Sequence, residues 1–251
     1  MANSPTGDTM TERIVRVLDT FGADRTLQTA AQIGRRSGLP SSTAHRIVDD
    51  LVRAGLLERD EDHRVRLGMR LWELALRGSS GLRLRQAALP FMTQVQARVR
   101  EHTQLAVLEQ DEALFLERLS HPDAGANITR VAGRLPLHAS SSGLVLLAFG
   151  PDELRRRVLS GKLVALSPET ITDATTLSRV LDDIRRVGYV VAPGSIESVS
   201  TGIAVPVRDA RGTVTAALSV VLPRDAPTAG PLDELRRAAA GISTALSADP
   251  R

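Results

Sequence analysis

The chain has 251 residues, 42% of them apolar, which is enough for one large globular domain or two smaller ones. Its 32 basic and 29 acidic residues leave a net charge of only +3, so a surface for nucleic acid has to be local rather than global. Cysteine is absent, which excludes disulfides, thiolate metal sites and cysteine nucleophiles, and no apolar run approaches the roughly 20 residues of a membrane span, so we expect a soluble cytoplasmic protein.

The N-terminal part of the chain predicts a helix-turn-helix. After a start that we expect to be disordered, residues 1–10, apolar side chains recur at intervals of three and four over residues 11–21, as in an amphipathic helix. A second helix is predicted over about residues 27–36 and a third over residues 41–54, joined by a short turn that contains Gly38. Two helices joined by a short glycine-containing turn are the signature of this motif.

A wing is predicted after the third helix. Residues 56–59 and 64–67 have the pattern of two short strands, and the polar residues 60–63 lie between them as a turn. A fourth helix is expected over residues 69–76, and the flexible run 78–81 marks a domain boundary.

The rest of the chain predicts an α+β domain with a largely antiparallel sheet. Residues 82–102 have a helical pattern, but Pro90 suits the first turn of a new helix, so we expect two helical pieces that meet there. Strands in consecutive hairpins then alternate with helices. We expect strands at 105–108, 113–119, 128–132, 190–191, 202–208 and 214–222, and helices at 142–149, 152–159, 176–187 and 232–246.

The third predicted helix carries the residues that we expect to contact DNA. Its first turns, where a recognition helix reaches base edges and phosphates, contain Ser41, Ser42, Thr43, His45 and Arg46. The alternative is ordinary N-capping by serine on a solvated face. The preceding helix, the glycine turn and the wing favour DNA binding, because one hypothesis then explains all of them.

A local positive face supports this interpretation. No acidic residue occurs between Asp24 and Asp49, an interval that contains Arg25, Arg35, Arg36 and Arg46. In the wing, Arg64 and Arg66 are further candidates for backbone contacts, although the acidic residues of the turn beside them oppose such contacts.

In this order and spacing, the motifs resemble those of the IclR family of transcriptional regulators. The resemblance covers nearly all of residues 11–248 and is carried by residues 13–21, 31–51, 65–71, 132–143 and 203–212. It implies double-stranded operator DNA as a partner, a small and often carboxylated or aromatic effector, and homodimers or homotetramers that associate through the DNA-binding part. We therefore expect disordered residues 1–10, a winged helix-turn-helix domain over 11–78, linker helices over 79–102 and an effector-binding domain over 103–248.

The segment that resembles the family's effector loop enters a helix at Ser140, Ser141, Ser142 and Gly143. Backbone amides and hydroxyls at the positive end of a helix suit an anion or a carbonyl oxygen, and plain helix capping is the alternative.

The resemblance places the rest of the effector site on strands, at Ala192, Gly202, Ile203, Ser219 and Val221. Here the sequence departs from the family pattern. Ala192 stands where aspartate is frequent, Gly202 replaces a frequent cysteine, and Val221 replaces a hydroxyl residue. This loss of polar groups disfavours a small 2-oxo acid and favours an effector with an apolar body and a polar end.

These observations predict a ligand-controlled transcription regulator without catalytic activity, metal or cofactor. The alternatives are a ligand-binding enzyme fused to a DNA-binding domain and an architectural DNA protein that senses nothing. His121, Asp123 and His138 are too scattered to predict a metal site, and the chain has no nucleophile elbow, Walker loop or dinucleotide-binding motif. The residues specify neither the operator nor the choice between repression and activation.

Overall fold

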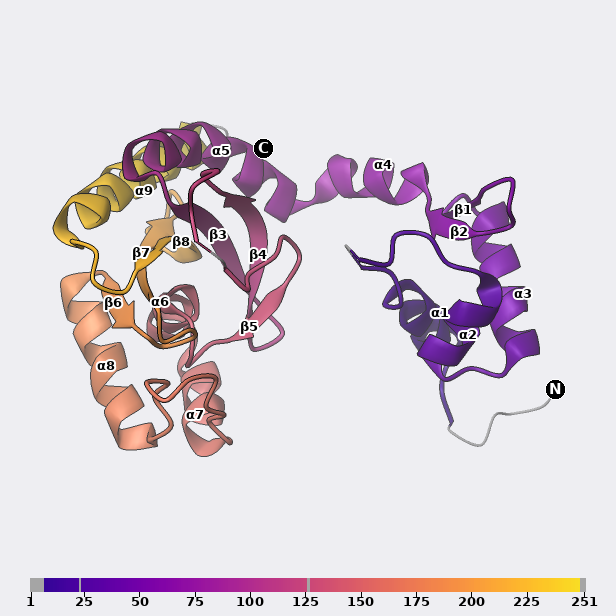
Figure 1. Cartoon of the computed structure of the whole chain (residues 1–251), viewed down its shortest axis with the longest axis horizontal. Coiled ribbons are helices and arrows are strands. Elements are labelled where there is room, and N and C mark those ends of the chain that lie inside the picture. Colours follow the sequence, from indigo (N-terminus) through magenta and orange to yellow (C-terminus); the bar gives the residue numbers. More distant parts are fainter. Residues whose placement is uncertain (1–6, 23, 126, 249–251) are drawn as a thin grey trace. The chain divides into compact units, whose positions relative to one another are not determined.

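The computed structural model describes residues 7–22, 24–125 and 127–248, and its contacts divide the chain into two compact units, Met1–Ser79 and Ser80–Arg251 (Figure 1). Each unit buries its own apolar side chains and therefore has its own core.

The first unit is a winged helix-turn-helix, as the sequence predicts. Three helices pack around the fully buried side chains of Val17, Ile33 and Ile47, and a two-stranded antiparallel sheet follows. In chain order the elements are α1 (Met10–Leu18), α2 (Ala30–Ser37), α3 (Ser41–Arg53), β1 (Leu57–Arg59), β2 (Val65–Leu67) and α4 (Met69–Gly78).

Helix α2 begins three residues later than expected, because two residues before it have other partners. Thr29 caps the helix in a capping box with Gln32, and each side chain accepts a hydrogen bond from the other's backbone amide. Gln28 pairs instead with Val65 of β2, through backbone hydrogen bonds of 2.9 and 2.6 Å. Gly38 ends the helix at φ +66°, which confirms the predicted left-handed cap.

The second unit is built on one antiparallel sheet of six strands in the order β5-β4-β3-β8-β7-β6. This arrangement confirms the predicted α+β class. Its elements are α5 (Ser80–Val99), β3 (His102–Glu109), β4 (Glu112–Leu119), β5 (Arg134–Pro136), α6 (Ser141–Phe149), α7 (Asp152–Ser160), α8 (Ala174–Val187), β6 (Val190–Pro193), β7 (Ser200–Arg208), β8 (Val214–Pro223) and α9 (Ala229–Ala248).

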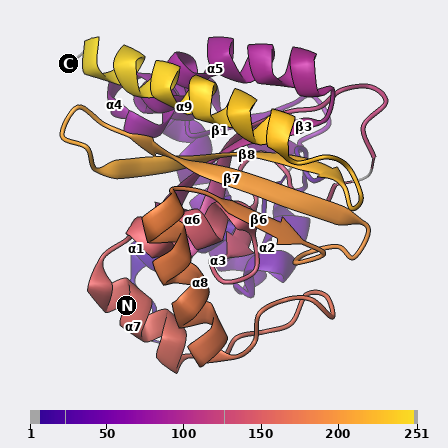
Figure 2. The ribbon, with the colours of Figure 1, turned by 90° about the vertical axis from the view of Figure 1, so that its left-hand side faces the viewer.

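Helices cover both faces of this sheet. Figure 2 shows α5 and α9 on one face and α6 and α8 on the other. Because side chains alternate along a strand, Ile203 and Val205 of β7 pack with α5 and α9, whereas Ala204 packs with α6. The two faces thus have separate cores. The serines of the candidate effector site, at the start of α6, lie on the α6 side.

Pro90 does not divide the helix that contains it, so the expectation of two helical pieces is wrong. Helix α5 is continuous from Ser80 to Val99. Ala88 and Met92 lie on either side of the proline and are fully buried against the sheet and α9. Burial of this face offsets the lost backbone hydrogen bond that an internal proline entails.

Two further expectations are corrected. The predicted flexible run 78–81 reduces to Ser79, the one residue between α4 and α5. Residues 128–132 form no strand, because the chain turns tightly there: the amide of Gly133 donates to the carbonyl of Arg130 at 2.9 Å, and Ala132 has φ +61°. The strand that pairs with β4 at this edge of the sheet is β5 instead.

Candidate functional sites

The first turn of α3 is free of side-chain caps. Pro40 is the N-cap residue and makes no side-chain hydrogen bond to the helix, so the alternative of capping by serine is wrong. Ser41, Ser42, His45 and Arg46 are exposed, Thr43 is half-buried, and the Nδ1 atom of His45 lies 2.8 Å from the carbonyl oxygen of Ser41. The face predicted to contact DNA is therefore accessible to DNA.

The arginines of this region differ in their surroundings. Arg35 and Arg46 are exposed and make no ion pair or hydrogen bond with any described residue. Arg36 instead donates to the side chain of Gln28, which is buried and itself donates to the carbonyl of Thr20 at 3.0 Å. Arg36 is thus tied to the core of the unit, whereas Arg35 and Arg46 keep unpaired charge.

The two wing arginines already have acidic partners. Arg64 pairs with Asp60 at 3.1 Å and with Asp62 at 2.9 Å, and Arg66 pairs with Glu58 at 3.0 Å. Hydrogen bonds from the amide of Met69 and from Arg66 hold the pKa of Glu58 below its ordinary value, so this partner remains charged at neutral pH. The wing therefore offers phosphates less free positive charge than the sequence suggests.

We expect Arg46→Ala to weaken operator binding by about 1 to 3 kcal/mol, the usual cost of losing a bidentate contact to a base. Titration of operator variants should locate the loss at one base position. Arg53→Ala on the same helix is the matched control, because Arg53 is exposed and already paired with Asp50. An unchanged affinity of the Arg46 variant would contradict the assigned role.

A turn of three serines forms the start of α6 in the second unit. The Oγ atom of Ser140 caps the helix by accepting a hydrogen bond from the amide of Gly143 at 3.0 Å. Ser142 donates to the side chain of Ser219 on β8 at 2.9 Å. The backbone amides of Ser141 and Ser142 and the hydroxyl of Ser141 have no hydrogen-bond partner among the described residues. Unpaired donors thus collect at the positive end of a buried helix.

Gly202 of β7 makes room for this turn. A Cβ atom at position 202 would lie 2.6 Å from the Oγ atom of Ser141, well inside van der Waals contact. The glycine that replaces a larger residue of the family pattern therefore lets the Ser141 hydroxyl approach the sheet closely.

A cavity opens beside the serine turn and encloses about 420 Å³, its solvent-open mouth included. The structure brings six of the predicted effector residues to its wall: Ser140, Ser141, Ser142, Ala192, Gly202 and Val221. Their part in binding an effector remains a prediction. The full lining is Gln104, Phe115, Asn127, Ile128, Thr129, Leu135, Ser140, Ser141, Ser142, Ala192, Ser195, Ile196, Glu197, Ser200, Gly202 and Val221.

Three predicted effector residues do not line this cavity. Ile203 is the neighbour of Gly202 on a strand, so its side chain points to the opposite face and packs in the core under α5 and α9. Ser219 lies behind Ser142 and is fully buried. Gly143 has a packing role instead, because a Cβ atom there would lie 2.6 Å from the carbonyl oxygen of Leu137.

The rest of the cavity wall is more polar than the sequence predicts. Gln104 of β3, Asn127 and Thr129 before β5, and Glu197 in the loop between β6 and β7 all line the cavity. Their positions carry no local pattern that marks a binding site. The available signal was the polar run His102, Thr103 and Gln104 at the start of a strand that continues with apolar residues.

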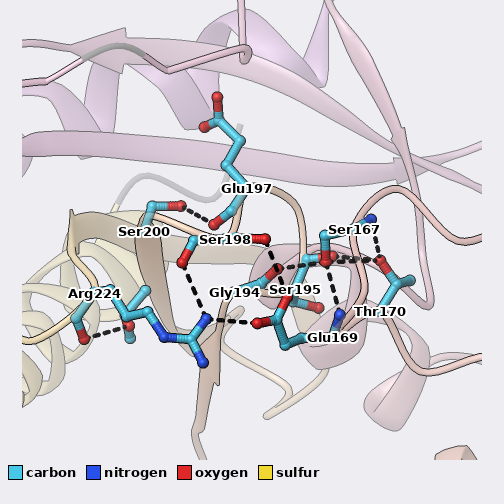
Figure 3. A network of polar contacts seen from close by, with 10 residues as sticks. Ser167, Glu169, Thr170, Gly194, Ser195, Glu197, Ser198, Ser200 and Arg224 are labelled. Carbon is cyan, nitrogen blue, oxygen red and sulfur yellow. Dashed lines mark hydrogen bonds and ion pairs between the residues drawn. The ribbon is translucent and has the colours of Figure 1, made fainter.

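A polar network fixes the cavity loop between β6 and β7, as Figure 3 shows. Thr170 donates to the carbonyl of Ser195 at 2.7 Å, and Ser195 donates to the carbonyl of Ala139, just before the serine turn, at 2.6 Å. Arg224, the residue after β8, pairs with Glu169 at 3.0 Å. The loop is thereby joined to the segment that contains Thr170 and to Ala139, the residue before the serine turn.

The scattered histidines and Asp123 do not form a metal site. Among the described residues, no group of three or more histidine, cysteine, aspartate or glutamate side chains is placed to hold a metal ion. His138 donates instead to the carbonyl of Val164 at 2.9 Å. None of the described helices is long and apolar enough to cross a membrane.

Known protein families match almost the whole chain. Residues 11–61 match the IclR helix-turn-helix domain, and residues 78–248 match the family described as bacterial transcriptional regulator IclR C-terminal. The chain belongs to the IclR family. This IclR-family protein is a DNA-binding transcriptional regulator under the control of a small-molecule effector, as the sequence predicts, and the alternative of an enzyme is wrong.

Relatives of this IclR-family regulator include one with a bound ligand. An IclR homolog from Microbacterium hydrocarbonoxydans, solved as a complex with 4-hydroxybenzoate, is 62% identical, with a TM-score of 0.91 and coverage of 96% of this chain and 100% of that one. The HTH-type transcriptional regulator XynR of Escherichia coli (strain K12) is 30% identical over 94% of this chain and 96% of its own. The p-hydroxybenzoate hydroxylase transcriptional activator of Acinetobacter baylyi is 30% identical over 81% of this chain and 77% of its own.

Proposed function

We propose that the effector of this regulator is an aromatic monocarboxylic acid of the size of 4-hydroxybenzoate. The observation that carries the proposal is the cavity at the start of α6, where unpaired amides of Ser141 and Ser142 suit a carboxylate. Phe115, Leu135 and Val221 supply apolar wall for a ring. The likeness to an IclR homolog solved with 4-hydroxybenzoate supports the same class.

The acidic residue in the cavity wall restricts the effector further. Glu197 lines the cavity, and its carboxylate has no ion-pair partner among the described residues. A second carboxylate on the effector would be repelled by this charge in a partly desolvated site. A monocarboxylate with a neutral far end avoids that cost.

Calorimetry on the full-length protein tests the effector class. We expect 4-hydroxybenzoate to bind at least about tenfold more tightly than glyoxylate or pyruvate, because a ring buries apolar surface that the small 2-oxo acids lack. The same ligand should change the affinity of the protein for its operator in a gel-shift titration. Tight binding of the small acids alone would overturn the proposal.

We also infer that the protein binds its operator as a homodimer or a homotetramer, with α4 as the contact between copies. None of the residues of α4 is buried within the unit, and Met69, Trp72, Leu74 and Leu76 are each about half exposed or more. A dimer also supplies the two recognition helices needed for half-sites one helical turn apart. Light scattering at micromolar concentration checks this assembly, and a monomer that binds the operator specifically would contradict it.

The DNA target also sets the expected location. A regulator that binds double-stranded operator DNA in a bacterial-type cell works in the cytoplasm, so we expect the protein there. Recognition is expected from the exposed first turns of α3, where Arg46 keeps a free positive charge.

A further inference from the structure

A buried donor without a partner lies in the wall of the effector cavity. The side-chain nitrogen Nδ2 of Asn127 is fully shielded from solvent and has no hydrogen-bond partner among the described residues. Asn127 is one of the residues that line the cavity beside the serine turn. A buried amide nitrogen without an acceptor is costly, so such a group needs an explanation.

The hydrogen bonds of Asn127 fix which end of its amide is left over. The backbone amide of Thr129 donates to the Oδ1 atom of Asn127 at 2.8 Å, and the Thr129 hydroxyl donates to the same oxygen. A backbone amide is always a donor, so the atom that faces it must be the oxygen. The side chain therefore cannot flip without losing the bond from this backbone amide, and the nitrogen remains the unpaired end.

A third residue of the cavity wall holds this orientation. The hydroxyl of Thr129 gives its one proton to Asn127 and accepts a hydrogen bond from the Nε2 atom of Gln104 at 2.6 Å. Gln104 and Thr129 are both buried. The carbonyl oxygens of Asn127 and Thr129 in turn accept hydrogen bonds from the guanidinium of Arg118. The segment that carries the unpaired nitrogen is thus anchored in both side chain and backbone.

We propose that Asn127 is a specificity-determining residue that donates a hydrogen bond to an acceptor atom on the far end of the effector. The inference deepens the proposed function and rests on it: the serine turn holds the carboxylate, and Asn127 selects an oxygen at the other end of the ring. An effector with a methyl or methylene group in that position leaves the buried donor unpaired.

The test compares two benzoates that differ in a single atom. 4-Methoxybenzoate has an ether oxygen where 4-ethylbenzoate has a methylene group, so their size and charge match while only the first offers an acceptor. For the unchanged protein we expect calorimetry to show binding of the methoxy compound about three- to tenfold more tightly, the value of one neutral hydrogen bond.

Two variants of Asn127 give opposite readouts. Asn127→Leu removes the donor and should bring the two affinities to within a factor of about two. Asn127→Asp keeps an oxygen for Thr129 but places an acceptor where the nitrogen was, so the preference should reverse in favour of 4-ethylbenzoate. Ser160→Ala, a change at an exposed residue of α7 outside the cavity lining, is the control and should keep the preference of the unchanged protein.

The outcomes separate the two proposals. A preference that persists in Asn127→Leu, or that is absent from the unchanged protein, overturns the assignment of Asn127 while leaving benzoates as effectors. Failure of both benzoates and of 4-hydroxybenzoate to bind the unchanged protein overturns the proposed effector class, and this assignment with it. Thermal unfolding of each variant confirms that it is folded before the affinities are compared.

Discussion

Replacing Gly143 with alanine is expected to destabilise the second unit by about 2 to 3 kcal/mol, toward the upper end of the usual cost of overpacking a core. A Cβ atom at position 143 would lie 2.6 Å from the carbonyl oxygen and 2.7 Å from the Cα atom of Leu137. Both are backbone atoms next to a largely buried helix, so relief of the contact cannot come from a flexible side chain that moves aside. The turn before α6 has to shift instead, and with it the donors of Ser141 and Ser142.

Urea unfolding and calorimetry with 4-hydroxybenzoate measure the two consequences. We expect a lower unfolding midpoint and a loss of binding of at least about tenfold, because the donors at the helix end lose their positions. Gly230→Ala near the start of α9 is the matched control, since a Cβ atom there meets nothing within 4 Å. Wild-type stability of the Gly143 variant would show that the serine turn tolerates a side chain and is not a rigid site.

The helix-turn-helix was predictable because its signals are local. Periodic apolar residues, the left-handed Gly38 and a polar turn between two short strands each specify structure within a few residues. The start of α2 was misplaced although its signal was present, since Thr29 and Gln32 form a capping box that the sequence shows directly. This capping box places the start of α2 at Ala30.

The interpretation of Pro90 failed for the opposite reason. A local rule predicts a break, but Ala88 and Met92 are both buried on the face that α5 presents to the sheet and to α9, and a continuous helix keeps both in place. The packing partners come from strands and from a helix far along the chain. No window of sequence around the proline contains that information.

The cavity shows the same division between local and distant information. The effector-site residues on strand β7 were placed by resemblance, and strict alternation along β7 already separates Gly202 from Ile203, so the error at Ile203 was avoidable. Asn127 and Glu197 lie in loops without periodic pattern, and only the fold brings them to one wall. The spacing of residues in the sequence therefore could not predict that these two line the cavity.

An irregularity in strand pairing was also beyond the sequence. Leu105 pairs with Glu117 and the next residue, Ala106, with Phe115, so Leu116 is an extra residue in β4. The bulge turns Phe115 toward the cavity side of the sheet and Glu117 toward α5. Without it, both side chains would share a face, and a carboxylate would lie in the apolar core.

Replacing Arg85 with methionine is expected to destabilise the second unit by about 2 kcal/mol. Arg85 of α5 pairs with Glu117 at 2.6 Å, and the Glu117 side chain is 8% exposed. Removing one partner of a buried pair leaves an uncompensated charge, at a cost of about 3 to 5 kcal/mol when both are fully buried. Because the Arg85 side chain is 36% exposed, water screens part of the charge and the expected cost is lower.

Urea unfolding of a double-mutant cycle measures this cost and its cause. In the Arg85→Met background, Glu117→Gln should restore much of the lost stability, because it removes a buried charge whose ion-pair partner is gone. Arg98→Met is the matched control on the same helix: Arg98 is 60% exposed, and its partner Glu234 also pairs with Arg237, so its loss should cost less than about 1 kcal/mol. Equal losses for the two arginines would show that the burial of Glu117 does not matter. A restored double variant would instead assign the cost to a carboxylate that the β4 bulge turns under α5.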